Sequence, residues 1–232
     1  MPTGSPSWRE QEEGLLSLPF TRRTDRWIYR IIACAGLTAV LSIVGLYYYG
    51  PPEYTRVGYA PTQPIAFSHA QHVGQLGMSC VYCHTRVEES PHANVPSTQT
   101  CMNCHQSIKP TSPLLAEVRA RWADGEPVAW RRVHKLPDYV YFNHAVHVRR
   151  GVGCVSCHGR VDEMSVVVHE KPMSMGWCLD CHRHPEKEIR PLDEVTNLTW
   201  SPPDGEDRRQ VGERWARRRA IGVQEQCSSC HR

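Results

Sequence analysis

The sequence predicts a mostly α-helical protein with little regular structure, preceded by one N-terminal membrane helix. Three observations predict this class. A Cys-x-x-Cys-His pentapeptide occurs five times between residues 80 and 231. The chain after residue 49 leaves each copy about 37 residues, which is too few for an independent apolar core around each one. The stretch 27–49 carries one charged residue and is about 34 Å long as a helix, enough to cross a bilayer.

The five pentapeptides carry the strongest signal, because they use ten of the 11 cysteines. Their spacing is typical of covalent c-type haem attachment, in which two thiols bond the porphyrin edge. The adjacent His then lies under the iron as proximal ligand. We therefore expect five covalently bound haem c groups. The attaching residues are Cys80, Cys83, Cys101, Cys104, Cys154, Cys157, Cys178, Cys181, Cys227 and Cys230, and the proximal ligands are His84, His105, His158, His182 and His231.

Other uses of paired cysteines explain the pattern less well. Zinc ribbons also contain Cys-x-x-Cys pairs, but they do not need a His directly after the second Cys. Disulfides do not require that His either. A thioredoxin-type redox motif would need a surrounding βαβ pattern, which no copy has.

With so little chain for each haem, the porphyrins themselves are expected to form the core, wrapped by short helices and loops. The net charge is +3 before cofactors, and haem propionates will make the finished protein more acidic. No basic-aromatic stripe suggests binding to nucleic acid.

The N-terminal part predicts a membrane anchor. Residues 1–26 form a polar tail, 27–49 the transmembrane helix, and 50–66 a proline-rich linker. Aromatic residues mark both ends of the helix, and Pro51-Pro52 is expected to end it. The arginines concentrate before the span, which places the N-terminus inside and residues 67–232 in the periplasm of a bacterial inner membrane. This orientation agrees with haem attachment outside the cytoplasm.

Two alternatives remain for this segment. A cleaved signal peptide is the rival interpretation, although the leader is long and no small-x-small site precedes Pro51. Ile32-Ala33-Cys34 loosely resembles a lipoprotein cleavage site, but the apolar run continues past Cys34. We expect Cys34 to be a small apolar helix residue without acylation.

The periplasmic part contains an internal repeat. Phe67-x-His69-x-x-His72 precedes the first motif, and Phe142-x-His144-x-x-His147 precedes the third. Residues 67–105 and 142–182 thus form two copies of a two-haem unit. Between them, Ser112 and Pro113 predict a capped helix to about residue 124, ended by Gly125. Residues 206–220 predict a charged, solvated helix, so that 206–232 holds this helix and the fifth haem.

Each iron needs a second axial ligand, usually His or Met. Eight His lie outside the motifs, so candidates exceed the five irons. A catalytic haem needs an open position, and this surplus therefore indicates electron transfer rather than an enzyme.

The Phe-x-His-x-x-His arrangement resembles class III multihaem cytochromes c. The resemblance implies that His69 ligates the haem of His84 and His144 that of His158. It further implies pairing of His72 with His105 and of His147 with His182. A His between motifs serves the last haem in that family, which points to His169 for the haem of His231. Alternatives are His92 for one of the last three assignments and Met175, ahead of Met173, for one iron. His134 and His184 are expected at the surface or near propionates.

The whole chain also resembles the pentahaem cytochrome subunit of bacterial alternative complex III. The N-terminal anchor, the five motifs, the strap at 130–142 and Met175-Gly176-Trp177 carry this resemblance. It implies relay of electrons from quinol oxidation toward a periplasmic cytochrome c or copper protein. It also implies partners: an iron–sulfur subunit of molybdoenzyme-like ancestry, polytopic quinol-binding subunits and a monohaem cytochrome c. The alternative is a self-contained, membrane-anchored quinol dehydrogenase cytochrome that feeds a periplasmic reductase.

Overall fold

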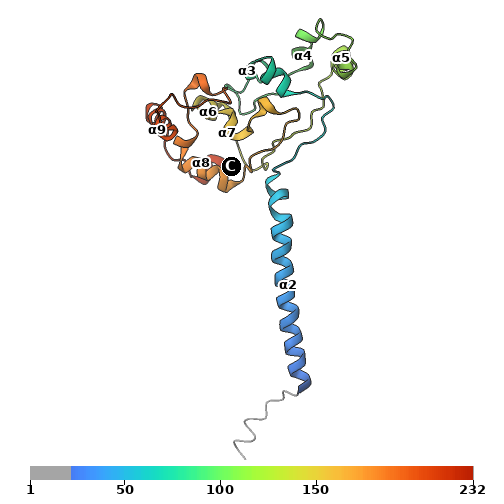
Figure 1. Cartoon of the computed structure of the whole chain (residues 1–232), viewed down its shortest axis with the longest axis vertical. Coiled ribbons are helices and arrows are strands. Elements are labelled where there is room, and N and C mark those ends of the chain that lie inside the picture. The colour runs from blue at the N-terminus through green and yellow to red at the C-terminus, as the bar shows by residue number, and fades with distance from the viewer. Residues whose placement is uncertain (1–21, 232) are drawn as a thin grey trace, which may run out of the picture. The chain divides into compact units, whose positions relative to one another are not determined.

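The computed structural model describes residues 22–231, so most of the tail predicted at 1–26 lies outside the described residues (Figure 1). The chain divides into two compact units, Met1–Pro51 and Pro52–Arg232. The described part of the first unit is a single helix. The second unit contains all five motifs.

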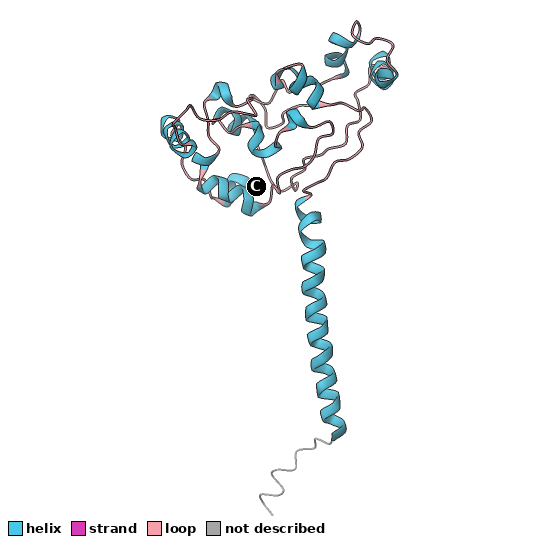
Figure 2. Cartoon of the chain, in the orientation of Figure 1, coloured by secondary structure: helices cyan, strands magenta, loops and turns pink. Residues whose placement is uncertain are grey.

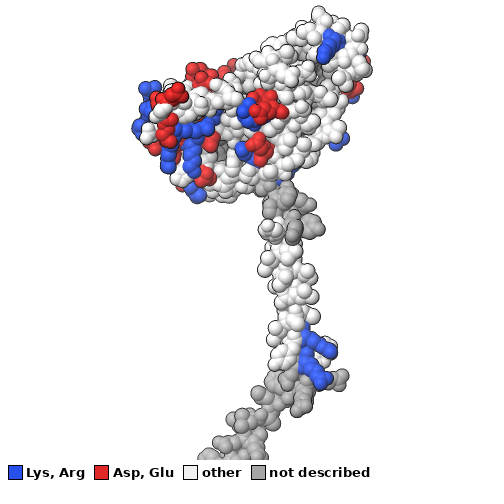
Figure 3. Space-filling model, viewed as in Figure 1, with Lys and Arg blue, Asp and Glu red and all other residues white. Residues whose placement is uncertain are grey.

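Helix α2 spans Arg22–Thr55 and contains the predicted membrane segment. Its window Arg26–Tyr47 has a mean hydropathy of 1.9, and none of that window is buried within the protein. Lys and Arg side chains gather at one end of the helix, and the remainder of its described surface on this face carries no charge (Figure 3). By length and composition, α2 could cross a membrane.

The helix ends later than predicted, because it continues through Pro51 and Pro52 to Thr55. A proline lacks the N–H that bonds the carbonyl four residues earlier, but its fixed φ is compatible with helical backbone. The helix ends where Arg56 adopts a φ of 54°, outside the right-handed helical region.

The second unit consists of short helices joined by loops (Figure 2). Extended pairing among residues 22–231 is limited to an isolated antiparallel bridge between Val152 and Ile189. The helices are η1 (Ala70–Gln75, a π-helix), α3 (Cys80–Cys83), α4 (Thr98–His105), η2 (Pro113–Leu115), α5 (Ala116–Ala123), α6 (His144–Arg149), α7 (Cys154–His158), η3 (Val161–Glu163), α8 (Met175–Arg183), η4 (Pro185–Lys187), η5 (Leu192–Glu194), α9 (Arg208–Arg218) and α10 (Cys227–Cys230).

Only small apolar clusters are buried in this unit. Ile65, Met102 and Val118 form one of them, where α4 packs against α5. Ile189 and Val195 are buried in another part of the unit. Many large apolar side chains are exposed, as expected if prosthetic groups supply much of the core.

The helix predicted after Ser112 forms as η2 followed by α5. Pro113 occupies the first turn, and Gly125 follows the helix with a φ of +70°. Ser112 does not cap it through its side chain, contrary to prediction. Its carbonyl oxygen instead accepts a hydrogen bond of 3.0 Å from Arg119 Nη1.

The predicted charged helix forms as α9. The Asp207 carboxylate caps it by accepting from the backbone N–H groups of Arg209 and Gln210, at 2.9 and 3.1 Å. Gly212 is buried in this helix and faces η4, where a Cβ atom would clash with the Glu186 carbonyl. The close contact between α9 and η4 therefore depends on this glycine.

Replacement of Gly212 by alanine should force α9 away from η4. We expect a loss of about 1–3 kcal/mol in the free energy of unfolding, as for other overpacked sites. Gly176→Ala is the matched control, because Gly176 also lies in a helix but has open space around its Cα. Thermal unfolding of both variants measures the difference, and equal stabilities would contradict the packing described.

Candidate haem sites

Each motif forms one helical turn with its two cysteines three residues apart. In α3, α7 and α10 the first Cys begins the helix, and the residue before it has extended backbone. Residues three apart lie on the same helix face, so both thiols of a motif can reach one porphyrin edge. All eleven cysteines lie in the described part of the chain, and all are free thiols.

Imidazole rings face each other across a regular gap at three motifs. The ring centroids of His72 and His105 are 6.2 Å apart, those of His147 and His182 are 6.1 Å apart, and those of His144 and His158 are 6.4 Å apart. Metal–imidazole bonds of about 2.0–2.1 Å on opposite sides of one ion require a centroid separation of roughly 6.3 Å. The rings of His144 and His158 are also nearly parallel, at 7°. The planes of the other two pairs lie at 70° and 53°, and all three centroid separations match that of two imidazoles on one ion.

In five of these six rings, and in two further motif histidines, the Nδ1 atom is hydrogen-bonded to a backbone carbonyl oxygen. A carbonyl oxygen can only accept, so the Nδ1 atom carries the proton and Nε2 keeps its lone pair for a metal. Metal-binding His residues commonly show this arrangement, which fixes ring orientation. The Nδ1···O distances are 2.9 Å for His72 (to Ser68), 2.7 Å for His84 (Asn94), 3.0 Å for His105 (Ile108), 2.9 Å for His144 (Pro91), 2.8 Å for His147 (Asn143), 2.8 Å for His182 (Gln224) and 3.1 Å for His231 (Tyr139).

The two repeat segments share their local geometry. Phe67 meets His69 edge-on at 4.9 Å and stacks on His72 at 4.3 Å. Phe142 meets His144 edge-on at 4.8 Å and stacks on His147 at 4.4 Å. In each copy one phenylalanine contacts both imidazoles. Each of the two imidazoles lies near the histidine of a different motif.

His69 lies near His84, the partner predicted for it. Burial lowers the pKa of His69 to about 4, with the nearby His84 as the next contributor. No ring contact joins His169 to His231 among the contacts of residues 22–231, and ligation of that iron by His169 stays a prediction. The His169 side chain is 1% exposed, and both of its ring nitrogens are buried without a hydrogen-bond partner.

His134, expected at the surface or near a propionate, is half-buried. Its ring lies 4.4 Å from that of His158 and 5.0 Å from that of His169, and its Nε2 is buried without a partner. Burial lowers its pKa to about 4. The sequence singled out the segment 130–142 as a strap. It did not predict that the His134 side chain of this segment points inward.

Among the ring contacts of residues 22–231, neither alternative ligand from the sequence faces another imidazole, although His92 is near enough to His144 to help lower its pKa, after burial. His92 is exposed, and its backbone N–H donates to Ser90 Oγ at 3.2 Å. Met175 is 65% exposed at the start of α8. Their ligation stays a prediction.

Comparison with known proteins agrees with this geometry. The profile of the family described as cytochrome c7 and related cytochrome c matches residues 65–119 and 140–232. This chain is a member of that family. Membership implies covalently bound haem c, which the free thiol pairs and the 6.1–6.4 Å gaps fit.

A curated relative is the multihaem cytochrome c subunit of menaquinone reductase from Nitratidesulfovibrio vulgaris (strain Hildenborough). The two proteins are 39% identical over 97 residues, which cover 41% of this cytochrome and 45% of the relative. The match thus spans less than half of either chain.

The thiols of different motifs of the cytochrome lie close to one another. Burial raises the pKa of Cys154 to about 11, and the Cys80 thiol adds to the increase. Burial raises the pKa of Cys157 to about 12, with Cys181 the next contributor. Burial and then Cys101 raise the pKa of Cys83, and burial and then Cys230 raise that of Cys178. The first motif therefore neighbours the second and the third, and the fourth neighbours the third and the fifth, which gives the order second, first, third, fourth and fifth.

Hydrogen bonds join the same neighbours. Asn103 of the second motif donates to the Tyr82 hydroxyl of the first at 3.1 Å. Arg183, next to the fourth motif, pairs with Glu225 just before the fifth at 2.5 Å. In the second unit, α3, α4 and α5 lie together, and α8 and α9 lie apart from them (Figure 1). The exposed cysteines Cys104 and Cys227 belong to the motifs at the two ends of this order.

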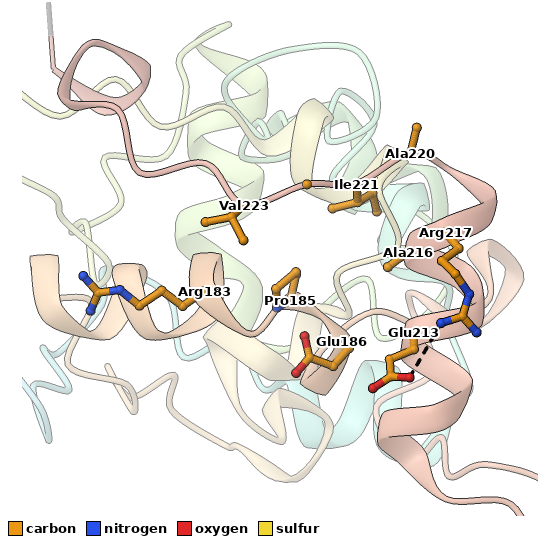
Figure 4. A pocket seen from close by; sticks show the side chains of 10 residues that line it. Arg183, Pro185, Glu186, Glu213, Ala216, Arg217, Ala220, Ile221 and Val223 are labelled. Carbon is orange, nitrogen blue, oxygen red and sulfur yellow. Dashed lines mark ion pairs between the residues drawn. The ribbon is translucent and has the colours of Figure 1, made fainter.

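A cleft of about 300 Å³ lies between α8, α9 and the segment that leads to the fifth motif. Val223 and Pro185 lie on opposite sides of the opening, and Glu213 pairs with Arg217 at its rim (Figure 4). Its lining combines apolar and charged side chains and includes no Cys or His of a motif.

Proposed function

We propose that the chain holds five haem c groups, one at each motif, and serves as the electron-relay subunit of a membrane-bound quinone oxidoreductase complex. The observation that carries this proposal is the set of facing imidazole pairs at 6.1–6.4 Å, each joining a motif His to a distant His. When bound, each haem supplies a one-electron iron couple.

The residues proposed to hold the irons are all histidines. The pairs are His84 with His69, His105 with His72, His158 with His144, His182 with His147, and His231 with His169. Two imidazoles on one iron leave no position open for a substrate, so the subunit relays electrons and has no catalytic site of its own. His92 and Met175 remain alternative ligands.

The spatial order of the motifs supports a relay with two ends. Every inner motif has one motif on either side, and the two end motifs contain the exposed Cys104 and Cys227. We propose that redox partners dock near these two motifs.

We further propose that α2 anchors the cytochrome in a bacterial inner membrane, with the N-terminus inside and the haem-binding unit in the periplasm. The exposed apolar surface of α2 and the arginines at one end support this topology. In this orientation the motifs lie in the compartment where c-type haem is attached.

Deletion of residues 1–51 tests the anchor. We expect a chain that starts at Pro52, exported behind a cleavable leader, to appear in the soluble periplasmic fraction with its haems, because the motifs lie in the other compact unit. The full chain should stay in the membrane fraction after a high-salt wash. If the mature full chain is also soluble and has lost its first residues, the segment is a signal peptide instead.

The complex itself is proposed from two similarities. The sequence resemblance points to alternative complex III, with an iron–sulfur subunit, polytopic quinol-binding subunits and a monohaem cytochrome c as partners. The relative's name instead gives menaquinone reductase. Both have a multihaem cytochrome beside a quinone-reactive membrane complex, and they differ in the direction of electron flow.

Purification under mild detergent, followed by identification of the co-eluting subunits, tests this assignment. Quinol-dependent reduction of a periplasmic cytochrome c or copper protein by the intact complex would support alternative complex III. Quinone reduction by a periplasmic donor would support a menaquinone reductase. Quinol reduction of the cytochrome purified alone would contradict both and favour the self-contained quinol dehydrogenase.

A further inference from the structure

A buried arginine without an acidic partner lies beside the third motif. The side chain of Arg190 is 0% exposed. Its Nη1 donates to the Asn197 carbonyl oxygen at 3.2 Å, but Nε and Nη2 have no hydrogen-bond partner. Within residues 22–231, no carboxylate lies within ion-pair distance of its guanidinium group. A buried charge without a counter-ion is costly.

Several contacts fix this charge in place. A Cβ atom on Gly153, the residue before Cys154, would clash with the guanidinium carbon, so the missing side chain makes room for Arg190. The guanidinium carbon lies 5.1 Å from the centre of the Trp200 ring. The Arg190 backbone N–H donates to Gly151 at 2.9 Å, and the Cys154 N–H donates to Val195 at 3.0 Å. The charge is therefore held rigidly against the backbone that carries the first attaching cysteine.

An acidic residue lies on the other side of the same motif. Ser156, between the two cysteines, donates its hydroxyl to the Glu188 carboxylate at 2.5 Å. Glu188 is partly buried and does not form an ion pair with Arg190. The third motif thus has a fixed positive charge beside Cys154 and a negative charge beside Ser156.

Fixed charges change the free energy of adding an electron nearby, and they act more strongly where burial lowers the effective dielectric constant. Arginine stays protonated in proteins, so its charge does not vary over the working pH range. A nearby positive charge favours the reduced state, and a nearby negative charge favours the oxidised state.

We propose that Arg190 and Glu188 set the potential of the haem attached through Cys154 and Cys157, with Arg190 raising it and Glu188 lowering it. This inference rests on the proposed function, which assigns a haem to the third motif. In this proposal Arg190 acts through its charge on the potential of the haem, and it contacts no reacting atom. Because the third motif is central in the spatial order, its potential affects transfer in both directions.

Spectropotentiometric titration of the full chain tests the proposal, with intact mass to verify haem content. We expect Arg190→Gln to lower one of the five transitions by about 59 mV, a tenfold shift in the ratio of oxidised to reduced protein for a one-electron couple. Arg190→Lys should keep the native value, and Glu188→Gln should shift the same transition upward. Arg208→Gln is the matched control, because exposed Arg208 also lies near Trp200, at 5.4 Å, and should change little.

Fully loaded Arg190→Gln protein with five unchanged transitions would overturn the inference. If Arg190→Gln does not load haem, the Glu188→Gln variant alone tests the inference. A potential that is unchanged or lower in Glu188→Gln would overturn the inference. If the intact mass of the unsubstituted protein shows no haem at the third motif, the proposed function is overturned instead. Failure of the inference and failure of the proposed function can therefore be distinguished.

Discussion

A chain in which Cys154 and Cys157 are both replaced by alanine is expected to lose one haem and, with it, electron transfer between the two ends of the subunit. The third motif neighbours both the first and the fourth, because Cys80 lies near Cys154 and Cys181 lies near Cys157. Removing the haem at the third motif should separate the remaining four haems into two pairs. Intact mass measures the loss of one haem, and pre-steady-state reduction measures transfer across the subunit.

Two control variants distinguish this effect from general damage. Cys34→Ala removes the one cysteine outside the motifs and should leave the haem content unchanged. Replacing Cys227 and Cys230 removes the haem at one end of the spatial order, so the other four haems should still exchange electrons. Rapid end-to-end transfer in the Cys154/Cys157 variant would contradict the spatial order.

Replacement of His144 by methionine should produce the largest change in potential. His144 faces His158 at 6.4 Å with nearly parallel rings, and we propose that they bind one iron. Methionine as an axial ligand favours reduced iron, so one transition should rise by roughly 100 mV. Redox titration detects the rise, and electron paramagnetic resonance identifies the change of ligand.

His92→Met is the matched control, because His92 is exposed and is the alternative ligand that the sequence allows. We expect its five transitions to match the native protein. No change in His144→Met would contradict the assignment of His144 to this iron, and a rise in His92→Met would assign His92 to one of the other irons.

The sequence predicted the helix after Ser112 and the charged helix α9 because the signals for these helices are local. The Cys-x-x-Cys-His and Phe-x-His-x-x-His segments likewise depend on residues a few positions apart, whereas the Asp207 cap of α9 was not predicted. The three pairs of rings that lie 6.1–6.4 Å apart are pairs that the class III resemblance implied, and their ligation of iron stays a prediction.

Long-range features were not predictable in this way. His134 is brought against His158 by a loop, and no spacing rule places it there. Arg190 appeared in the sequence as one charged residue in a proline-rich loop, and its burial depends on Gly153 and Trp200. The extension of α2 through two prolines shows that a strong local signal can fail when the backbone still accepts the required φ.

The mass of the intact mature protein tests the central claim most directly. The account predicts the mass of the mature chain plus five haem groups, retained under denaturing conditions because each is bound through two thioethers. A mass equal to that of the bare chain, or fewer than five covalent haems in protein from a host able to attach them, would contradict it.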